Sequence, residues 1–334
     1  MKKKWLSIGL LVFIVVALFF ILREIGIREI FSLIFKANPY ILALAFFSLF
    51  LMYFMWSLIL SHSSGKLIGK DISVFKILPI YFAGSFFNAL TPGAKMGGEP
   101  VRAYYLSKKY GGNKSTHLAG ILFQKFLNYG AHLILIIFSL ISLMVLFGSG
   151  QYTNIVYGVI TLFVFIFVLV LVIFAINKKF EWIIKKFSFL YIFFNKSFEG
   201  REEFTNYLIE KYENFLTGFN GLLKQKRFTF VFLMASVLGK LFMVGTFYFV
   251  FLSLGVDVSF FFVLISVTFV SMIYELSFIP GGIGIAEGGF IFVYSLFGIA
   301  GVDAASATLL SRGIEYFYIL VVGSLSYIWL RYRG

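Results

Sequence analysis

The pattern P-G-x5-E occurs twice in this chain, as Pro92-Gly93-Ala94-Lys95-Met96-Gly97-Gly98-Glu99 and as Pro280-Gly281-Gly282-Ile283-Gly284-Ile285-Ala286-Glu287. Each copy follows an apolar run, Ile80 to Leu90 or Phe269 to Ile279, and precedes a segment that restarts as a helix near the Glu. Proline lacks an N–H donor and glycine adopts positive φ without strain, so both copies end a helix and leave backbone groups unpaired. A membrane tolerates such a break only where protein or a wet cavity surrounds it. The two copies are therefore predicted to be broken membrane segments that face each other and form the working site.

The composition is that of a membrane protein. Hydrophobic residues make up 60% of the 334 residues, charged residues make up 13%, and the mean hydropathy is +0.94. These values lie far from the profile of a soluble globular protein. The absence of cysteine excludes disulfides and Cys-ligated metals, and the scattered His62, His117 and His132 do not indicate a metal site. We expect no metal and no cofactor.

Long apolar runs predict about six full transmembrane helices and two hairpins. The full crossings begin at Trp5, Pro39, Leu118, Ile155, Phe228 and Ala304. The run that ends at Leu90 and the run that starts at Ala286 are shorter than the about 20 residues that a span needs. We therefore predict that both Pro-Gly segments are re-entrant hairpins within a single transmembrane domain, 1–334. The predicted fold class is an all-α polytopic membrane protein.

The distribution of positive charge predicts the orientation. With the N-terminus inside, most of the 29 Lys and Arg residues fall in cytoplasmic segments, as the positive-inside rule requires. If the first Pro-Gly segment crossed the membrane, the basic residues from Lys95 to Lys114 would lie outside. The prediction is a multi-pass protein of the cytoplasmic membrane with both termini in the cytoplasm. Its first hairpin opens to the cytoplasm and its second to the exterior. The run Trp5 to Leu22 lacks a small-residue cleavage site and is predicted to be an uncleaved span.

A basic residue follows each motif at nearly the same spacing. Lys125 follows Glu99, and Arg312 follows Glu287, each within the next span. Lys125 lies roughly 12 Å from the cytoplasmic face of the membrane and Arg312 roughly 12 Å from the exterior face. Both are therefore close to the midplane of a hydrocarbon core about 30 Å thick. The pattern predicts one unit used twice in opposite orientation, over 61–147 and 228–330. Inverted repeats with broken helices that meet near the midplane are the architecture of many transporters.

The restarted helices favour an anionic ligand, because their first N–H groups and the positive ends of their dipoles lie at the breaks. Lys95, Arg102, Lys125 and Arg312 add positive charge there. The predicted ligand-binding residues belong to the two breaks and their charged neighbours: Pro92, Gly93, Lys95, Gly98, Glu99, Arg102, Lys125, Pro280, Gly281, Gly282, Gly284, Glu287, Arg312 and Glu315.

Several of the charged residues have two interpretations. Glu99 and Glu287 either cap the restarted helices and hold basic neighbours, or they contact the ligand or carry a proton. Glu315 shares a helix face with the basic residue three positions before it, which also fits a purely internal pair. Lys240 and Glu275 either steady the second hairpin or belong to a polar path.

The segment 177–227 is the one sizeable polar piece of the chain. It mixes basic, acidic and aromatic residues in a pattern typical of amphipathic helices that lie on the anionic cytoplasmic surface of a membrane. A docking surface for a partner protein is the alternative. At about 50 residues the segment is too small for a typical enzyme domain.

Three features resemble the lysylphosphatidylglycerol synthase transmembrane family, which is the flippase-like membrane region of the multiple peptide resistance factor. They are Asn88-Ala89-Leu90-Thr91-Pro92-Gly93 with Gly98-Glu99-Pro100-Val101-Arg102, the stretch Phe278 to Glu287, and Arg312 in the last span. The resemblance covers nearly the whole chain and implies lipid translocation between leaflets, with Glu99, Arg102, Lys125, Glu287 and Arg312 as candidate site positions. Lys125 stands where the family pattern leads us to expect arginine. Because the chain ends at Gly334 after its last span, we expect a stand-alone membrane region without the aminoacyltransferase domain, and a lysylated substrate is not carried over.

The function that fits these observations is translocation of an anionic or zwitterionic phospholipid or glycolipid headgroup across the cytoplasmic membrane. No G-x4-G-K-[ST] motif is present, so transport would be passive, ion-coupled or driven by an enzyme that consumes the lipid. The alternative is a non-transporting accessory subunit that presents a lipid-linked sugar to a glycosyltransferase. An intramembrane enzyme is disfavoured because no nucleophile and base cluster in the sequence. The expected partners are membrane lipids, with a lipid-modifying enzyme or glycosyltransferase in the alternative, and no nucleic acid; the sequence predicts no particular oligomeric state.

Overall fold

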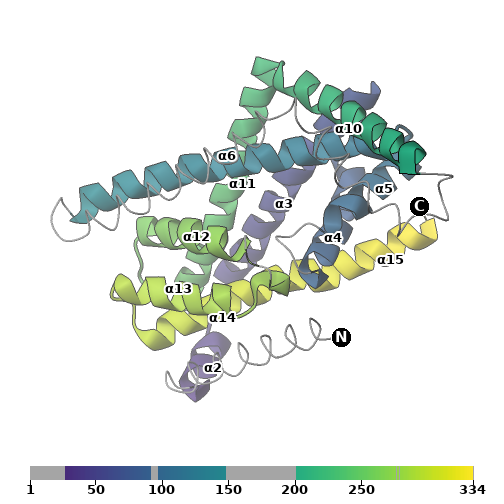
Figure 1. Cartoon of the computed structure of the whole chain (residues 1–334). Coiled ribbons are helices and arrows are strands. Elements are labelled where there is room, and N and C mark those ends of the chain that lie inside the picture. Colours follow the sequence, from purple (N-terminus) through teal and green to yellow (C-terminus); the bar gives the residue numbers. More distant parts are fainter. Residues whose placement is uncertain (1–26, 92–96, 148–200, 276, 278, 334) are drawn as a thin grey trace.

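The computed structural model describes residues 27–91, 97–147, 201–275, 277 and 279–333. Over these residues the chain is helical and contains no strand (Figure 1). The elements in chain order are α2 (Ile27–Phe35), α3 (Pro39–Ile68), α4 (Val74–Leu90), α5 (Gly98–Tyr110), α6 (Lys114–Phe147), α10 (Arg201–Leu223), α11 (Lys226–Ser253), α12 (Phe260–Glu275), the 3-10 turn η3 (Pro280–Gly282), α13 (Ile285–Leu296), α14 (Gly301–Tyr316), the π-helix η4 (Phe317–Val322) and α15 (Gly323–Arg333). The predicted spans from Trp5 and Ile155 lie outside the described residues.

Four described helices are long and apolar enough to cross a membrane. They are α3, α6, α11 and the continuous run of α14, η4 and α15, and each is at least 28 residues long. They coincide with the crossings predicted from Pro39, Leu118, Phe228 and Ala304, although α6 begins at Lys114 and α14 at Gly301. The earlier starts have a simple cause, because polar residues at the membrane surface continue the helix beyond its apolar run. The protein is an all-α, multi-pass membrane protein.

The helices on either side of each Pro-Gly motif form a hairpin that returns to the level of the membrane at which it starts. In the first hairpin α4 packs on α5, and Lys70 Nζ, just before α4, donates to the carbonyl oxygen at the end of α5, Tyr110, at 2.8 Å. In the second hairpin α12 packs on α13, and Phe262 near the start of α12 stacks on Phe297 directly after α13, with ring centroids 4.6 Å apart. With 17 and 16 residues, α4 and α12 are shorter than a full span.

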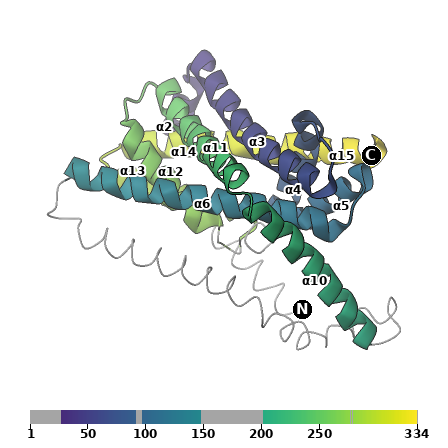
Figure 2. The same ribbon diagram turned by 90° about the horizontal axis from the view of Figure 1, so that it is seen from above.

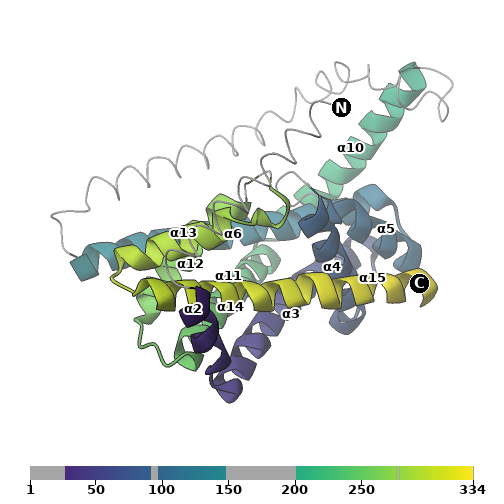
Figure 3. The same cartoon turned by 90° about the horizontal axis from the view of Figure 1, so that it is seen from below.

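Both halves of the described chain use the same order of packed helices. The contacts α3–α4, α4–α5 and α5–α6 in the first half correspond to α11–α12, α12–α13 and α13–α14 in the second. Asn38 N, at the start of α3, donates to Ser253 O, at the end of α11, at 2.7 Å, so these two long helices run antiparallel. Figures 1 and 3 show that α6 and the α14–α15 span also run in opposite directions. This order begins at α3, upstream of the predicted range 61–147.

Each hairpin also packs against the other half of the molecule. The helix α4 contacts α15, and α12 contacts α6. An aromatic cluster lies where α4 meets the π-helix η4, just before α15: the Phe82 ring of α4 is 4.8 Å from the Tyr53 ring of α3 and 5.9 Å from the Tyr318 ring of η4, measured between centroids. The Tyr318 hydroxyl donates to the Phe46 carbonyl oxygen at 3.0 Å. The second break, η3, also contacts α4, so the described parts of the two hairpins meet inside the bundle.

The helix α10 makes up most of the described part of the polar segment 177–227. Its apolar face, which includes Phe215, Phe219 and Leu222, packs with Phe123 and Phe126 of α6. Beyond this contact α10 projects away from the helical bundle (Figure 2). The helix is amphipathic, with acidic residues in its first turn.

Candidate functional site

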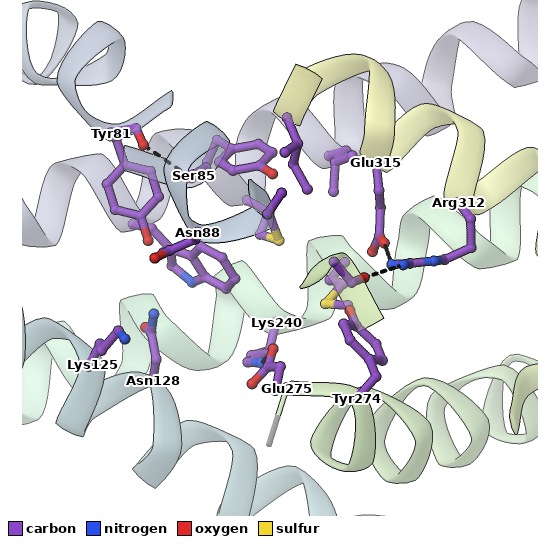
Figure 4. Close-up of a pocket in the computed structure, with 18 of the residues that line it drawn as sticks. Tyr81, Ser85, Asn88, Lys125, Asn128, Lys240, Tyr274, Glu275, Arg312 and Glu315 are labelled. Carbon is purple, nitrogen blue, oxygen red and sulfur yellow. Dashed lines mark hydrogen bonds and ion pairs between the residues drawn. The ribbon is translucent and has the colours of Figure 1, made fainter. Parts of the chain in front are cut away.

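A cavity of about 130 Å³ lies between the two hairpins (Figure 4). Both hairpins and the spans α3, α6, α11 and α14 contribute to its wall. Its charged lining consists of Arg102, Lys125, Lys240, Glu275, Arg312 and Glu315, and its aromatic lining of Tyr53, Trp56, Tyr81, Tyr129 and Tyr274. Ionisable side chains at membrane depth are costly and are usually retained for function. This cavity is therefore the candidate functional site.

The first charged cluster joins the restarted helix α5 to the span α6. Lys125 Nζ lies 2.8 Å from Glu99 Oε1, and Arg102 Nη1 lies 3.7 Å from the same oxygen. Glu99 and Arg102 are 4% and 3% exposed, so neither charge is screened by bulk water. The cluster holds two cations and one carboxylate, which leaves one positive charge in excess.

Helix α4 fixes the orientation of Arg102. Its Nη2 donates to Tyr81 O at 3.2 Å and to Ser85 Oγ at 3.0 Å, and its guanidinium carbon lies 3.8 Å from the centre of the Tyr81 ring. A Cβ at Gly84 would overlap the Arg102 side chain, so α5 approaches α4 this closely only because residue 84 is glycine. Small residues commonly allow helices to approach in this way in membranes.

The first break is capped from the preceding helix. Asn88, near the end of α4, accepts the Gly98 N–H at 2.6 Å through Oδ1, and its Nδ2 donates to Glu99 Oε1 at 3.4 Å. Asn88 thus satisfies one of the N–H groups that the start of α5 leaves unpaired. The predicted site residues Pro92, Gly93 and Lys95 lie outside the described residues.

The second break depends on three glycines with positive φ. Gly281, Gly282 and Gly284 have φ of 66°, 65° and 83°, a region that L-residues with a Cβ rarely adopt. Glu287 in the first turn of α13 accepts the Gly284 N–H at 2.6 Å through Oε2. The capping role predicted for Glu287 is therefore present in the structure, together with an ion pair.

The second charged cluster surrounds Arg312. Its Nε donates to Glu287 Oε1 at 2.9 Å and its Nη1 to Glu315 Oε2. Its Nη2 donates to Gly281 O and to Tyr316 Oη, each at 2.8 Å. Arg312 thus ties α14 directly to the backbone of the second break. The cluster holds one cation and two carboxylates, so its excess charge is negative.

The two clusters are alike in position and opposite in charge. Each contains a Glu in the first turn of a restarted helix that pairs with a basic residue in the following span. The sequence predicted positive charge at both breaks, whereas among the described residues the first break has a positive excess, around Glu99, Arg102 and Lys125, and the second does not. At the second break the two carboxylates outnumber the guanidinium of Arg312.

A third ion pair lies between these clusters. Lys240 Nζ of α11 lies 3.2 Å from Glu275 Oε1 at the end of α12, and both side chains line the cavity. Figure 4 shows the pair between Lys125 and Asn128 on one side and Arg312 and Glu315 on the other.

The structure assembles most of the predicted site. Arg102, Lys125, Gly281, Arg312 and Glu315 line the cavity directly. Glu99 and Glu287 stand behind these residues as ion-pair partners, Gly98 begins α5, and Pro280, Gly282 and Gly284 belong to the second break. Among the described residues no three His, Asp or Glu side chains gather as metal ligands would.

The predicted site left out several residues that the structure places in the cavity wall, among them Asn88, Lys240 and Glu275. Asn88 is a polar residue in an apolar run, and this contrast could have identified it as a candidate. Lys240 and Glu275 were identified as polar residues of spans, but their pairing joins positions 35 apart in the sequence. The aromatic residues Trp56 and Tyr274 carried no signal, because 21% of the chain is aromatic.

Comparison with known proteins places the chain in a family. It matches the sequence model described as "Lysylphosphatidylglycerol synthase TM region" over residues 6–323. It is similar to UPF0104 membrane proteins of three archaea. It is 25% identical to that of Methanothermobacter thermautotrophicus over 326 residues, which cover 94% of this chain and 92% of that protein. It is 27% identical to that of Methanocaldococcus jannaschii, over 92% of this chain and 89% of that protein. It is also 27% identical to that of Pyrococcus horikoshii, over 76% of this chain and 77% of that protein. As the paired motifs predicted, the chain belongs to the family of the lysylphosphatidylglycerol synthase TM region.

Proposed function

We propose that this protein moves the polar headgroup of a lipid between the leaflets of the cytoplasmic membrane through the cavity between its hairpins. The acyl chains remain in the surrounding bilayer. The barrier to such movement is the cost of removing a charged headgroup from water, which is far larger than the cost for a neutral group. A buried cavity whose charges are already oriented can replace that water.

One observation carries this proposal. A glutamate at each hairpin break pairs with a basic residue of the following span, at 2.8 Å for Glu99 with Lys125 and at 2.9 Å for Glu287 with Arg312. Both basic residues line the same cavity, which each hairpin approaches from its own half of the molecule. A site built in this way from two oppositely directed broken helices suits alternating exposure to the two leaflets.

The remaining parts of the proposal follow from the sequence. Both termini lie in the cytoplasm, the protein is a transporter without enzyme activity, and its partners are membrane lipids. Since no nucleotide-binding motif is present in the sequence, transport is passive, coupled to an ion or driven by consumption of the lipid.

A scrambling experiment tests the function. The purified protein is placed in vesicles that contain fluorescent phosphatidylglycerol, phosphatidylethanolamine or a glycolipid, and dithionite bleaches the label in the outer leaflet. In vesicles that contain wild-type protein, we expect dithionite to bleach more label than the outer leaflet alone holds, for at least one of the lipids. The double variant Glu287→Gln/Arg312→Gln removes both charges and retains polar side chains, and we expect it to lower the rate at least about tenfold.

The matched control is Glu210→Gln on α10, whose side chain is 60% exposed and lies outside the cavity. It should scramble as wild type does. If no lipid moves with folded wild-type protein, even with an imposed ion gradient, the proposal is contradicted and a stable co-purifying glycosyltransferase should be sought. Equal scrambling rates for wild type and the double variant would show that these charges of the cavity are not needed for lipid movement.

A further inference from the structure

Lys240 is a cation in the middle of a membrane span. It lies near the centre of α11, a helix of 28 residues, which is about 42 Å long and therefore exceeds the hydrocarbon core at both ends. Its side chain is 5% exposed. A lysine at this depth is expensive and needs compensation from its surroundings.

The surroundings of Lys240 compensate the charge only in part. An ammonium group carries three N–H donors. Within the part of the chain that the structure describes, its one hydrogen-bond acceptor is Glu275 Oε1 at 3.2 Å. Its other close contact is the Trp56 ring, whose centre lies 5.6 Å from Nζ. Two N–H donors of Lys240 therefore remain for a further acceptor.

A second unused donor belongs to the same wall. Trp56 lines the cavity beside Lys240, and its indole Nε1 is buried without a hydrogen-bond partner among the described residues. Buried donors without an acceptor are rare and call for an explanation. A ligand that brings several acceptor oxygens to this point would satisfy both residues.

The other cations of the cavity are bound more fully. Arg312 donates to two carboxylates, a carbonyl and a hydroxyl, as described above. Arg102 donates to a carbonyl and a hydroxyl and stacks on Tyr81. Lys125 has a shorter ion pair, 2.8 Å, than the 3.2 Å pair of Lys240. Lys240 is thus the cation that a headgroup at the centre of the cavity can engage at the lowest cost.

We propose that Lys240, together with the indole N–H of Trp56, binds the phosphate of a lipid headgroup at the midpoint of its path, and that the Glu275 carboxylate occupies this position while the cavity is empty. The proposal rests on the function proposed above and assigns a binding residue to it. A carboxylate and a phosphate diester each carry one negative charge and accept hydrogen bonds from an ammonium, so one can replace the other. The positive excess of the Arg102 and Lys125 cluster offsets the additional charge.

This assignment differs from a purely structural one. If the pair only clamped α12 to α11, removal of either partner would loosen the second hairpin. If the carboxylate competes with the headgroup, removal of the carboxylate should instead strengthen binding. The two accounts therefore predict opposite effects for Glu275→Gln.

Trp56 provides the readout, because its ring contacts Lys240. In a background with Trp5→Phe, Trp182→Phe and Trp329→Phe, Trp56 is the one remaining tryptophan of the four. The full-length protein in detergent is titrated with phosphatidylglycerol, with diacylglycerol as the lipid without phosphate, and with soluble glycerol phosphate. We expect a saturable change of Trp56 fluorescence with phosphatidylglycerol alone. An equal response to glycerol phosphate would assign the site to a free phosphate ester and overturn the lipid assignment.

Three variants separate the accounts. Lys240→Met, which keeps the length of the side chain but not its charge, should abolish the response, while Lys240→Arg should preserve it. Glu275→Gln should lower the apparent Kd about fivefold, since it removes a charged competitor. Unchanged binding in Lys240→Met, or weaker binding in Glu275→Gln with an unchanged melting temperature, would overturn the proposal. If Lys240→Met fails to fold, Lys240→Arg and Glu275→Gln still decide it.

The vesicle assay distinguishes this inference from the proposed function. Scrambling by wild type without any Trp56 response would leave lipid translocation in place and refute the role of Lys240. Phosphate-dependent binding at Trp56 without scrambling would support the site and refute translocation.

Discussion

The guanidinium of Arg312 and the ammonium of Lys125 hold corresponding positions but do different work. Arg312 contacts four groups in three directions: two carboxylates, the Gly281 carbonyl and the Tyr316 hydroxyl. Lys125 makes a point contact with Glu99, and its side chain is 20% exposed. A planar fork of donors is needed at the first position and a single charge is sufficient at the second.

Exchange of the two basic residue types should therefore be asymmetric. Arg312→Lys cannot reach all four acceptors, and we expect it to lower the scrambling rate at least about tenfold and to reduce thermal stability. Lys125→Arg keeps the charge next to Glu99, and we expect a rate within about twofold of wild type, although the family resemblance led us to expect arginine at this position. Equal losses in both variants would contradict the difference in roles.

Some features of individual residues could be predicted from the sequence. The spacing from each motif Glu to the next basic residue predicted a correspondence, and both pairs form ion pairs. The sequence offered Glu315 and Glu287 as separate partners of a basic residue, but the negative excess around Arg312 could not be predicted, because the two carboxylates reach it from two different helices. One asparagine in an apolar run marks Asn88 as unusual, but its hydrogen bond to the start of α5 is visible only in the folded protein.

At the scale of elements, the hairpins depend on close approach of their helices. In the first hairpin Gly84 of α4 lies against Arg102 and against the start of α5 at Gly98. In the second, a Cβ at Gly282 would contact the Tyr274 side chain of α12 at 2.9 Å. Glycine is therefore needed at these positions for close packing of the helices, in addition to its role in the turns.

Enlarging Gly84 should separate the first hairpin. Gly84→Ala places a methyl group on the Arg102 side chain, and we expect a loss of about 1–3 kcal/mol, seen as a lower melting temperature in detergent. The matched control is Gly313→Ala, at an exposed helical glycine with no atom within 4 Å of the added Cβ, which should be neutral or slightly stabilising. Equal melting temperatures for the two variants would show that the described approach of α4 and α5 is wrong.

The elements themselves were largely predictable, because periodicity is not needed to find an apolar run of more than 20 residues. Helix α4 ends before the first Pro-Gly motif and α5 begins after it, the second break lies at η3, and α4 and α12 are as short as a re-entrant segment requires. The π-helix at Phe317–Val322 was not predicted, since its residues fit an ordinary span. Its extra residue per turn is recognisable only from the backbone, and it lies where the last span packs against α4.

At the scale of the whole molecule, the hairpins predict a specific sidedness. The chain contains no cysteine, so a thiol reagent labels a single introduced cysteine and no other residue of the protein. Lys70→Cys and Asn113→Cys flank the first hairpin, and Ser259→Cys and Ala300→Cys flank the second; all four positions are exposed. An impermeant maleimide should label the first two only from the cytoplasm and the last two only from outside. Labelling of the two flanks of one hairpin from opposite sides would show that it crosses the membrane.

The central claim is that a lipid headgroup passes through the cavity between the hairpins, and blocking that cavity tests it most directly. Ala89 lines the cavity, whereas the next residue, Leu90, is 53% exposed and does not. Ala89→Trp fills the space without removing a charge, and Leu90→Trp adds a similar side chain outside it. In the dithionite assay we predict that Ala89→Trp stops scrambling while Leu90→Trp scrambles as wild type does. Scrambling by folded Ala89→Trp at the wild-type rate would contradict the account, because the headgroup would then be using another route.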